Sequence, residues 1–271
     1  MTTSVLAQMP QNPSPMVEHR RAHPRIKEQT PPGRRENLSS GTLFIPHRVR
    51  VRRGIPLLFF FHGGKWLPEV AAARRGMAVV TMQIGSGSGI YDRAFATPGT
   101  FDKLLAEVRG RLGVEPGRIT LGGWSAGCGA IRAILRDDAA YSRVASILAI
   151  DGIHADYRTG KPGPLESDID PRNLEIWRKL AQDAIAGRKS FMLTHSEIFP
   201  GTFVSTTESA DWLLRELNLK PRPVLRWGPM GSQQLSEARA GKFELRGYAG
   251  NTAPDHVDQL HSLADYLKRL K

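Results

Sequence analysis

The 271-residue sequence has a single cysteine and no long apolar run, and each of these shortages excludes a class of protein. Cys128 cannot form an internal disulfide, and one cysteine cannot build a zinc site made of several thiolates. The longest apolar run, residues 55–61, is far shorter than the roughly 20 residues that a membrane-spanning helix needs. We therefore expect a soluble protein without a membrane span, stabilised by a buried core.

The N-terminal segment lacks both hydrophobic periodicity and the apolar stretch of a secretory signal peptide. The absence of a recognisable signal favours a cytoplasmic location. Residues 1–40 are rich in Pro, Gln, Arg and Ser, a composition typical of a poorly ordered or surface-hugging arm. Residues 41–271 are expected to form the folded domain.

Acidic residues are scarce as well: 26 Asp and Glu stand against 38 Lys and Arg, a formal net charge of +12. Such an excess suggests an anionic partner. Residues 1–53, however, contain ten of the basic and three of the acidic residues, so +7 of the charge lies there and only +5 in the other 218 residues. Because no aromatic residue that could stack on bases precedes Phe44, we expect no specific nucleic-acid partner.

From residue 41 onward, short apolar runs alternate with amphipathic segments, and turns rich in Gly and Pro separate them. This order is typical of a mostly parallel sheet with crossover helices. The runs predict about eight strands, at residues 41–46, 56–61, 77–84, 118–124, 144–151, 190–195, 224–227 and 243–248. The amphipathic segments predict helices at residues 101–112, 126–135, 173–186, 208–217 and 257–270.

A Gly-x-Ser-x-Gly pattern, Gly-Trp-Ser-Ala-Gly at residues 123–127, lies between a predicted strand and a predicted helix. In that context a sharp turn presents the serine, with backbone N–H groups and a helix N-terminus directed at its hydroxyl. Such a turn needs neighbours without bulk, which the glycines at 122, 123, 127 and 129 supply. Ser125 is therefore the candidate nucleophile, and Cys128, three residues later, is expected to be a small packed residue.

A second motif, Phe-Phe-Phe-His-Gly-Gly at residues 59–64, joins the first in a family resemblance. On these two motifs the sequence resembles the α/β-hydrolase family, especially its esterase and depolymerase-like members, over residues 41–271. The resemblance implies an α/β-hydrolase fold with helices on both faces of the central sheet. It also implies that an oxyanion hole is formed by the backbone N–H of Ala126 with that of Gly64 or Lys65.

A serine hydroxyl needs an imidazole to accept its proton, and the sequence contains eight histidines. The family order of serine, then acid, then histidine places the base on the loop before the last helix. His256 fits this description, because its polar loop leads directly into the terminal predicted helix. His261 lies farther on, inside that helix.

The acid has two candidates. Asp151 ends an apolar strand at the sheet edge where Ser125 is expected, and active sites of open α/β sheets form at this edge. The family places its acid more often after the next strand, where this sequence offers only Glu197. We favour Asp151 and keep Glu197 as the alternative.

Four further side chains are expected to border the pocket, namely His62, Trp124, His154 and His195. None of the histidines has metal-ligand spacing with a third donor, so we expect no metal and no cofactor. The 38-residue interval before the strand at 190 permits a loop and a helix but no large lid domain. An open cleft of this kind suits a bulky or polymeric substrate.

The resemblance thus implies a serine hydrolase that cleaves a carboxylic ester, in a small molecule or a polymer, through an acyl-enzyme. Two alternatives stay open. A peptidase, amidase or acyltransferase would use the same triad, and the unusual acid position would also suit a noncatalytic binding protein with this fold.

Overall fold

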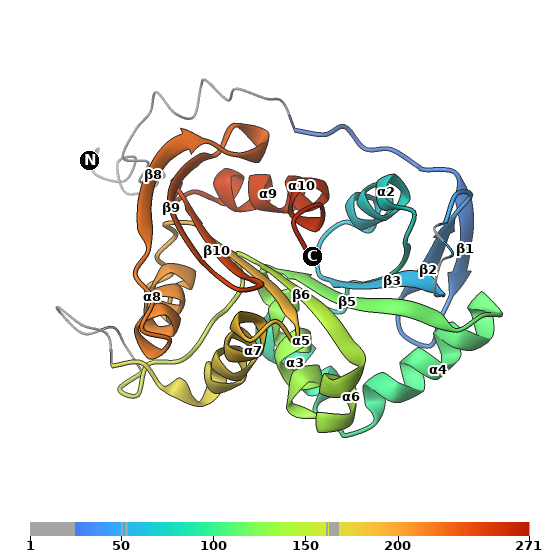
Figure 1. The fold of residues 1–271 in the computed structure, drawn as a ribbon, viewed down its shortest axis with the longest axis horizontal. Coiled ribbons are helices and arrows are strands. Elements are labelled where there is room, and N and C mark those ends of the chain that lie inside the picture. Colours follow the sequence, from blue (N-terminus) through green and yellow to red (C-terminus); the bar gives the residue numbers. More distant parts are fainter. Residues whose placement is uncertain (1–24, 50, 52–53, 161, 163–167, 271) are drawn as a thin grey trace, which may run out of the picture.

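The computed structural model describes residues 25–49, 51, 54–160, 162 and 168–270. Within them, ten strands form one mixed sheet in the order β1-β2-β4-β3-β5-β6-β7-β10-β9-β8 (Figure 1). The strands are β1 (Gly33–Asn37), β2 (Thr42–Pro46), β3 (Ile55–Phe61), β4 (Ala78–Met82), β5 (Pro116–Trp124), β6 (Val144–Ile150), β7 (Ser190–His195), β8 (Arg222–Trp227), β9 (Gln233–Ala240) and β10 (Phe243–Tyr248). From β4 to β10 the neighbours are parallel, whereas the outer pairs at both ends are antiparallel.

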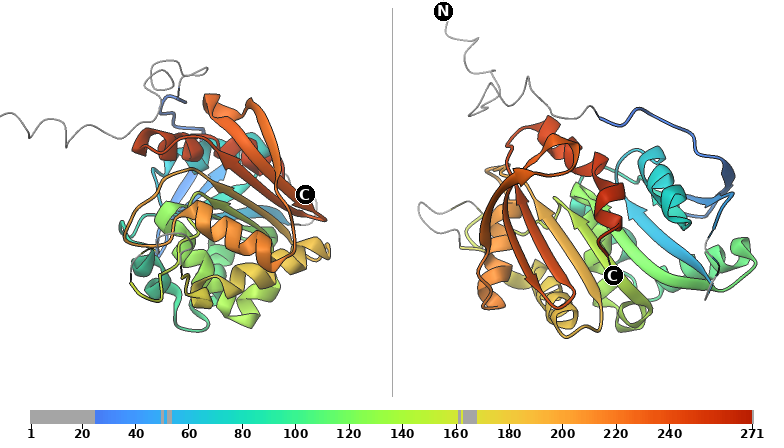
Figure 2. Two further views of the ribbon diagram at one scale, coloured as in Figure 1. Left: turned by 90° about the vertical axis from the view of Figure 1, so that its left-hand side faces the viewer. Right: turned by 45° about the horizontal axis from the view of Figure 1, so that its top comes forward.

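Helices cover both faces of this sheet, as Figures 1 and 2 show. One face carries α2 (Trp66–Arg75), α9 (Ala253–His261) and α10 (Leu263–Leu267). The other carries α3 (Ser88–Phe95), α4 (Thr100–Leu112), α5 (Cys128–Arg136), α6 (Asp138–Arg143), α7 (Glu175–Ile185) and α8 (Thr206–Glu216). Each layer buries its own core against the sheet.

Strand β3 shows how the sequence produces the two cores. Its side chains alternate between the faces, so that Leu57, Phe59 and Phe61 pack in one core and Leu58 and Phe60 in the other. All five are essentially inaccessible to solvent. A parallel strand covered by helices on both sides must be apolar at every position, which explains the unbroken apolar run.

The predicted α/β architecture, with a parallel core and helices on both faces, is confirmed, but the sheet has ten strands instead of about eight. The two additional strands are β1 and β9, which are Gly-Arg-Arg-Glu-Asn and Gln-Gln-Leu-Ser-Glu-Ala-Arg-Ala. Both lie in the antiparallel outer parts of the sheet and carry many polar residues. A search for apolar runs cannot detect strands of this composition. Helices α2, α3 and α6 were likewise not predicted.

Strand β1 lies inside the segment that the sequence assigns to an arm, so the sheet begins before residue 41. Arg35 on β1 forms an ion pair of 2.6 Å with buried Glu69 of α2. Farther toward the N-terminus, Arg25 pairs with Asp258 of α9 at 2.7 Å. Residues 1–24 of the predicted arm lie outside the described residues.

Between β6 and β7, where the sequence permits a loop and a helix but no large lid domain, the described residues contain α7 and a short 3₁₀ helix at Pro171–Asn173. None of the helices in the described ranges has the length and apolar character to cross a membrane.

Candidate active site

Ser125 lies on a sharp turn at the end of β5. It begins a 3₁₀ helix, Ser125–Gly127, that continues into α5. Its φ of +50° lies in the left-handed region. This conformation is unfavourable for any residue that has a Cβ, and it persists only where the surrounding structure enforces it. Any Cβ at Gly127 would overlap the carbonyl oxygen of Phe61 on β3, so glycine is required for this close approach. The strand–turn–helix context predicted for the motif is present.

Gly152 is a second glycine that this turn requires, and the sequence motifs did not identify it. A Cβ at Gly152 would lie 2.7 Å from the backbone nitrogen of Ser125 and also overlap its carbonyl oxygen. The ends of β5 and β6 are therefore in direct backbone contact. The Asp-Gly pair at the end of an apolar strand is the one signal that could have pointed to it.

Asp151 follows β6 and lies against His256. The two side chains are joined by a hydrogen bond of 2.7 Å between His256 Nδ1 and Asp151 Oδ2. A carboxylate can only accept, so Nδ1 carries the hydrogen and Nε2 is left as the proton acceptor. Asp151 also has a positive φ of +44°. The aspartate favoured from the sequence is thus the one that contacts the favoured histidine.

The carboxylate of Asp151 is 1% exposed and receives further hydrogen bonds. Ser196 donates its backbone N–H at 2.8 Å and its hydroxyl at 2.6 Å, and the Thr206 hydroxyl donates at 2.7 Å. Burial alone would raise the pKa of Asp151. The hydrogen bond and charge attraction to His256, together with the hydrogen bonds from the Ser196 and Thr206 hydroxyls, instead lower this pKa to about 2. Asp151 is therefore ionised at neutral pH. Ser196 and Thr206 carry no sequence signal that marks them as its partners.

His256 lies in the first turn of α9 rather than in the loop before the helix. Thr252 and Asp255 form a capping box that starts α9 earlier than the apolar pattern indicates. Trp124, the neighbour of Ser125, donates its indole N–H to the His256 carbonyl at 3.0 Å, and the two rings lie 4.5 Å apart. The residue next to the nucleophile thus helps to hold the candidate base.

Two cavities meet at Ser125. The smaller, about 130 Å³, is lined by Ser125, Asp151 and His256, and most of its surface is apolar; its other lining residues are Ile198, Pro200, Phe203, His154, Ser205 and Thr206. The larger, about 440 Å³, is lined by Ser125 and Ala126 and by polar groups of the 86–89 loop and of Arg132, Asp156 and Asn173. His154 and Phe203 line both cavities, so they lie between them.

His154 lies between these cavities, with its ring edge-on to Phe203 at 5.0 Å. Its Nδ1 is buried and has no hydrogen-bond partner in the described part of the chain. Burial lowers the pKa of His154 to about 4, although attraction to Asp151 acts in the opposite direction. His154 is therefore neutral at pH 7.

The other sequence-selected side chains lie outside the two cavity linings. His62 has a φ of +71°, stacks on Trp124 at 5.2 Å and is hydrogen-bonded to the Tyr91 hydroxyl at 3.0 Å. His195 is buried, hydrogen-bonded to Thr207 at 3.1 Å, and fills the space left by Gly247 on β10. The structure does not bring His195 to the pocket as the sequence suggested.

Glu197, the alternative acid, is exposed. Its backbone N–H donates to the carbonyl of Gly250 at 2.9 Å. Within the described residues no ion pair or hydrogen bond joins its carboxylate to His256, whose partner is Asp151.

Two of the amides after β3 are already engaged. The N–H of His62 donates to the carbonyl of Met82 at 2.9 Å, and that of Gly63 to Gln83 Oε1 at 2.8 Å. Gly64 and Lys65 follow, both exposed, and Lys65 is the N-cap of α2. Gln83 was not predicted, and its role is to fix the turn before these amides.

Cys128 is buried and donates to the carbonyl of Gly123 at 3.5 Å. Burial raises the pKa of its thiol well above the ordinary value. It is a packed residue at the start of α5. Across the described residues no group of three or more His, Cys, Asp or Glu side chains has an arrangement that could hold a metal ion.

No protein-family model matches the chain, and no curated protein matches its sequence significantly. Among solved structures, it is similar to poly(aspartic acid) hydrolase-1 from Sphingomonas sp. KT-1, with a TM-score of 0.50 and 13% identity, covering 89% of this chain and 99% of that one. It is also similar to apo Thermogutta terrifontis esterase 2 (TM-score 0.49, 15% identity, 88% and 94% covered). A third similar structure is acetyl xylan esterase from Aspergillus awamori, with a TM-score of 0.45 and 12% identity, covering 82% of this chain and 93% of that one. The architecture and the similarity to poly(aspartic acid) hydrolase-1 show that the chain has an α/β-hydrolase fold.

Proposed function

We propose that the protein is a serine hydrolase that cleaves carboxylic esters through an acyl-enzyme. The observation that carries the proposal is the 2.7 Å hydrogen bond between Asp151 and His256, on a cavity that Ser125 also lines. Asp151 and His256, 105 residues apart in sequence, are in contact at the cavity that Ser125 also lines from its strained turn. A structural ion pair alone would not need that turn.

In the proposed mechanism Ser125 Oγ attacks the carbonyl carbon of the ester. His256 Nε2 accepts the hydroxyl proton as the new C–O bond forms, and Asp151 stabilises the resulting imidazolium. The imidazolium then protonates the alcohol oxygen as the bond from the carbonyl carbon to that oxygen breaks. The alcohol leaves, and Ser125 carries the acyl group.

Water completes the cycle in the reverse sense. His256 accepts a proton from a water molecule that attacks the acyl carbon, and then returns this proton to Ser125 Oγ as the acid is released. The negative oxygen formed in each half-reaction needs hydrogen-bond donors. We assign the backbone N–H of Ala126, with that of Gly64 or Lys65, to this task, and loss of one such donor costs about 100- to 1000-fold in rate.

Asp151 is supported as the acid over Glu197 because it touches His256 and is held ionised by Ser196 and Thr206. The hydrogen bonds from Ser196 and Thr206 hold the Asp151 carboxylate in one orientation, and the carboxylate in turn orients the imidazole of His256. Glu197 is exposed, so reaching His256 would require it to move.

The two cavities support a substrate class. The smaller cavity beside His256 has a mainly apolar wall and room for a short acyl group. The larger one offers hydroxyl, amide and charged groups, which suit a polar, hydroxyl-rich alcohol. We therefore expect a short-chain acyl ester of a polar alcohol, with any bulk of the substrate on the alcohol side.

The test is hydrolysis of a matched series: acetyl, butanoyl and octanoyl esters of one aryl alcohol, an acetylated polyol, and the acetyl amide of the corresponding aryl amine. We expect kcat/KM to fall from acetyl to octanoyl, and the ester to be cleaved faster than its amide. Faster cleavage of the amide would favour the amidase alternative. Absence of turnover on every member, in folded protein, would contradict the proposal.

A further inference from the structure

A basic groove lies away from Ser125, beside the last helix of the chain. It is a cavity of about 890 Å³ lined by residues of β8, β9 and β10, of the turn after β8, and of α10 and the two residues that follow it. Five cationic side chains line it, namely Arg226, Arg239, Arg246, Lys268 and Arg269, against one carboxylate, that of Asp265. The proposed mechanism uses none of them.

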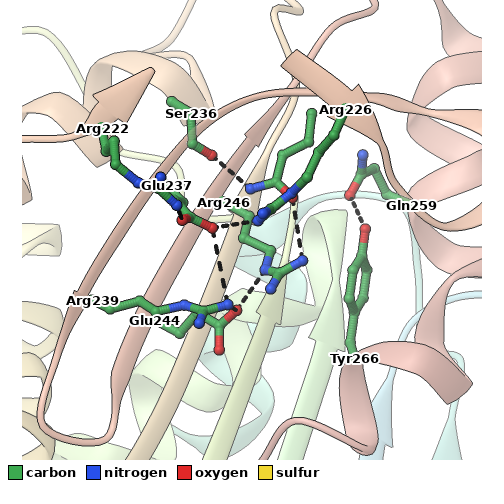
Figure 3. Close-up of polar contacts among 10 residues, drawn as sticks. Arg222, Arg226, Ser236, Glu237, Arg239, Glu244, Arg246, Gln259 and Tyr266 are labelled. Carbon is green, nitrogen blue, oxygen red and sulfur yellow. Dashed lines mark hydrogen bonds and ion pairs between the residues drawn. The ribbon is translucent and has the colours of Figure 1, made fainter. Parts of the chain in front are cut away.

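Three of the four arginines that line the basic groove, Arg226, Arg239 and Arg246, are held in place by two glutamates. Glu237 on β9 is paired with Arg222 and Arg226 of β8 and lies 3.9 Å from Arg239. Figure 3 shows these guanidinium groups converging on its carboxylate from different strands. A hydrogen bond from Arg222 and a second one from Arg226 lower the pKa of Glu237 to about 2, although burial acts in the opposite direction and would raise it.

Glu244 on β10 holds the other half of the network. It pairs with Arg239 at 3.0 Å and with Arg246 at 2.5 Å. Arg246 is 3% exposed and also donates to Gln234, whose side-chain oxygen accepts from Arg226 as well. A buried guanidinium that lines a cavity and is fixed on two sides is a preorganised donor.

The network leaves positive charge uncompensated. Counting the lining residues with their partners, six cations face three carboxylates, those of Glu237, Glu244 and Asp265. Each guanidinium has five N–H donors, more than its shared carboxylate can accept. A concave surface with excess positive charge concentrates anions, and arginine binds phosphate and carboxylate groups with paired hydrogen bonds.

The groove has an apolar wall too. Trp227, 63% exposed at the end of β8, lines it together with Pro229 and Met230. Its cationic groups come from three strands and from the end of α10, so a single small anion could engage only some of them. An organic molecule with several anionic groups matches both the spread of charge and the apolar wall.

We propose that the basic groove binds a small organic anion that carries two or more phosphate or carboxylate groups. The cavity volume lies within the range of about 300–1,000 Å³ typical of small-molecule sites. The site is separate from Ser125, so the proposal does not depend on the hydrolase function.

Calorimetric titration of the full-length protein with pyrophosphate and with citrate, in about 0.15 M salt, tests this proposal. We expect saturable binding of at least one probe with one molecule per chain. Binding of pyrophosphate alone identifies phosphate as the ligand group, and binding of citrate alone identifies carboxylate. The double variant Arg239→Gln/Arg269→Gln is expected to weaken binding about tenfold or more.

A matched control removes the same charge elsewhere. Arg178→Gln/Lys179→Gln changes two partly exposed cations on α7, far from the groove in sequence and on the other face of the sheet, and should leave the affinity unchanged. Circular dichroism verifies that both variants are folded. Equal weakening by the two variants would show diffuse attraction and overturn the proposal. Absence of saturable binding, or binding only of long polyphosphate or oligonucleotide, would overturn it as well.

Discussion

The sheet edge at Ser125 and the basic groove beside α10 both collect polar side chains, but the fold holds them in different ways. At the sheet edge, His62, Ser125 and Asp151 are three of the five non-glycine residues with positive φ in the described chain. In the groove, Met230 of the apolar wall is a fourth, but the arginines of β8, β9 and β10 lie on strands and are held by their side-chain partners. Backbone strain fixes one geometry at the first region, whereas the second has donors in excess.

The difference suggests what each region is suited for. A reaction needs one arrangement of few groups, and around Asp151 every carboxylate contact is satisfied by a named donor. Recognition of a charged ligand needs hydrogen-bond donors that are oriented and still available. The arginines of the groove share their carboxylate partners, so some of their N–H donors remain available. Variants that affect one region and spare the other sharpen this contrast.

The largest expected effect is that of Ser125→Ala. Removing the nucleophile should lower kcat for ester hydrolysis by a factor on the order of 10⁴ to 10⁶. Anion binding in the basic groove, measured by calorimetry, should be unchanged. Loss of both properties in folded protein would break the separation of the two regions.

Replacement of the acid comes next. Asp151→Asn should lower kcat about 10⁴-fold, because an amide cannot hold His256 in the tautomer with a free Nε2. The matched change Glu197→Gln should leave kcat within about twofold of the unmodified enzyme. Stopped-assay kinetics on one ester measures both, and the reverse ranking would assign the acid to Glu197.

A smaller effect is expected from Gly152→Ala. The new Cβ would collide with the backbone of Ser125 and displace the turn. A displacement approaching 1 Å costs about 100-fold in rate, so kcat should fall by about 10- to 100-fold with little change in KM. The comparison variant is Gly110→Ala on α4, where a Cβ meets nothing within 4 Å and which lines neither cavity. Unchanged kinetics in Gly152→Ala would show that strain at Ser125 has no role.

The smallest predicted effect concerns His154 and stability. Its pKa is lowered from 6.5 to about 4 on folding, so between these values the unfolded chain binds more protons than the folded one. The free energy of unfolding therefore falls as pH falls from 6.5 to 4, by at most about 1.4 kcal/mol per pH unit from this group. The pKa of Asp151 is lowered to about 2 on folding, so this group reduces the free energy of unfolding only below about pH 4.

His154→Gln should make the acid side of the stability profile less steep between pH 6.5 and 4. Urea unfolding at several pH values measures this slope, and the values above pH 7 serve as the internal control. An identical slope in the variant would mean that His154 is not held neutral by the fold.

The sequence predicted the parts of the molecule that short-range patterns encode. The β3 run and the glycines around Ser125 are signals of this kind, because each needs only neighbouring residues to be read. The strands of the central sheet and the turn at Ser125 followed from them, whereas His256 was selected through the family order and Asp151 was kept beside Glu197 as one of two candidates.

Features formed by contacts between distant segments were not accessible in this way. Gly152 matters because its backbone meets that of Ser125, and Ser196 and Thr206 matter because both reach Asp151. Strand β9 was missed because polar side chains conceal its pairing. The basic groove joins β8 to α10, more than 30 residues later, and its residues show no pattern along the chain.

The central claim is that Ser125 is an activated nucleophile served by His256. Labelling the folded protein with a fluorophosphonate probe at neutral pH, followed by peptide mass spectrometry, tests it most directly. We predict one phosphonyl adduct per chain, on Ser125, formed rapidly in the unmodified protein and very slowly in His256→Ala. No adduct on Ser125 in folded protein, or equal labelling in the two proteins, would contradict the claim.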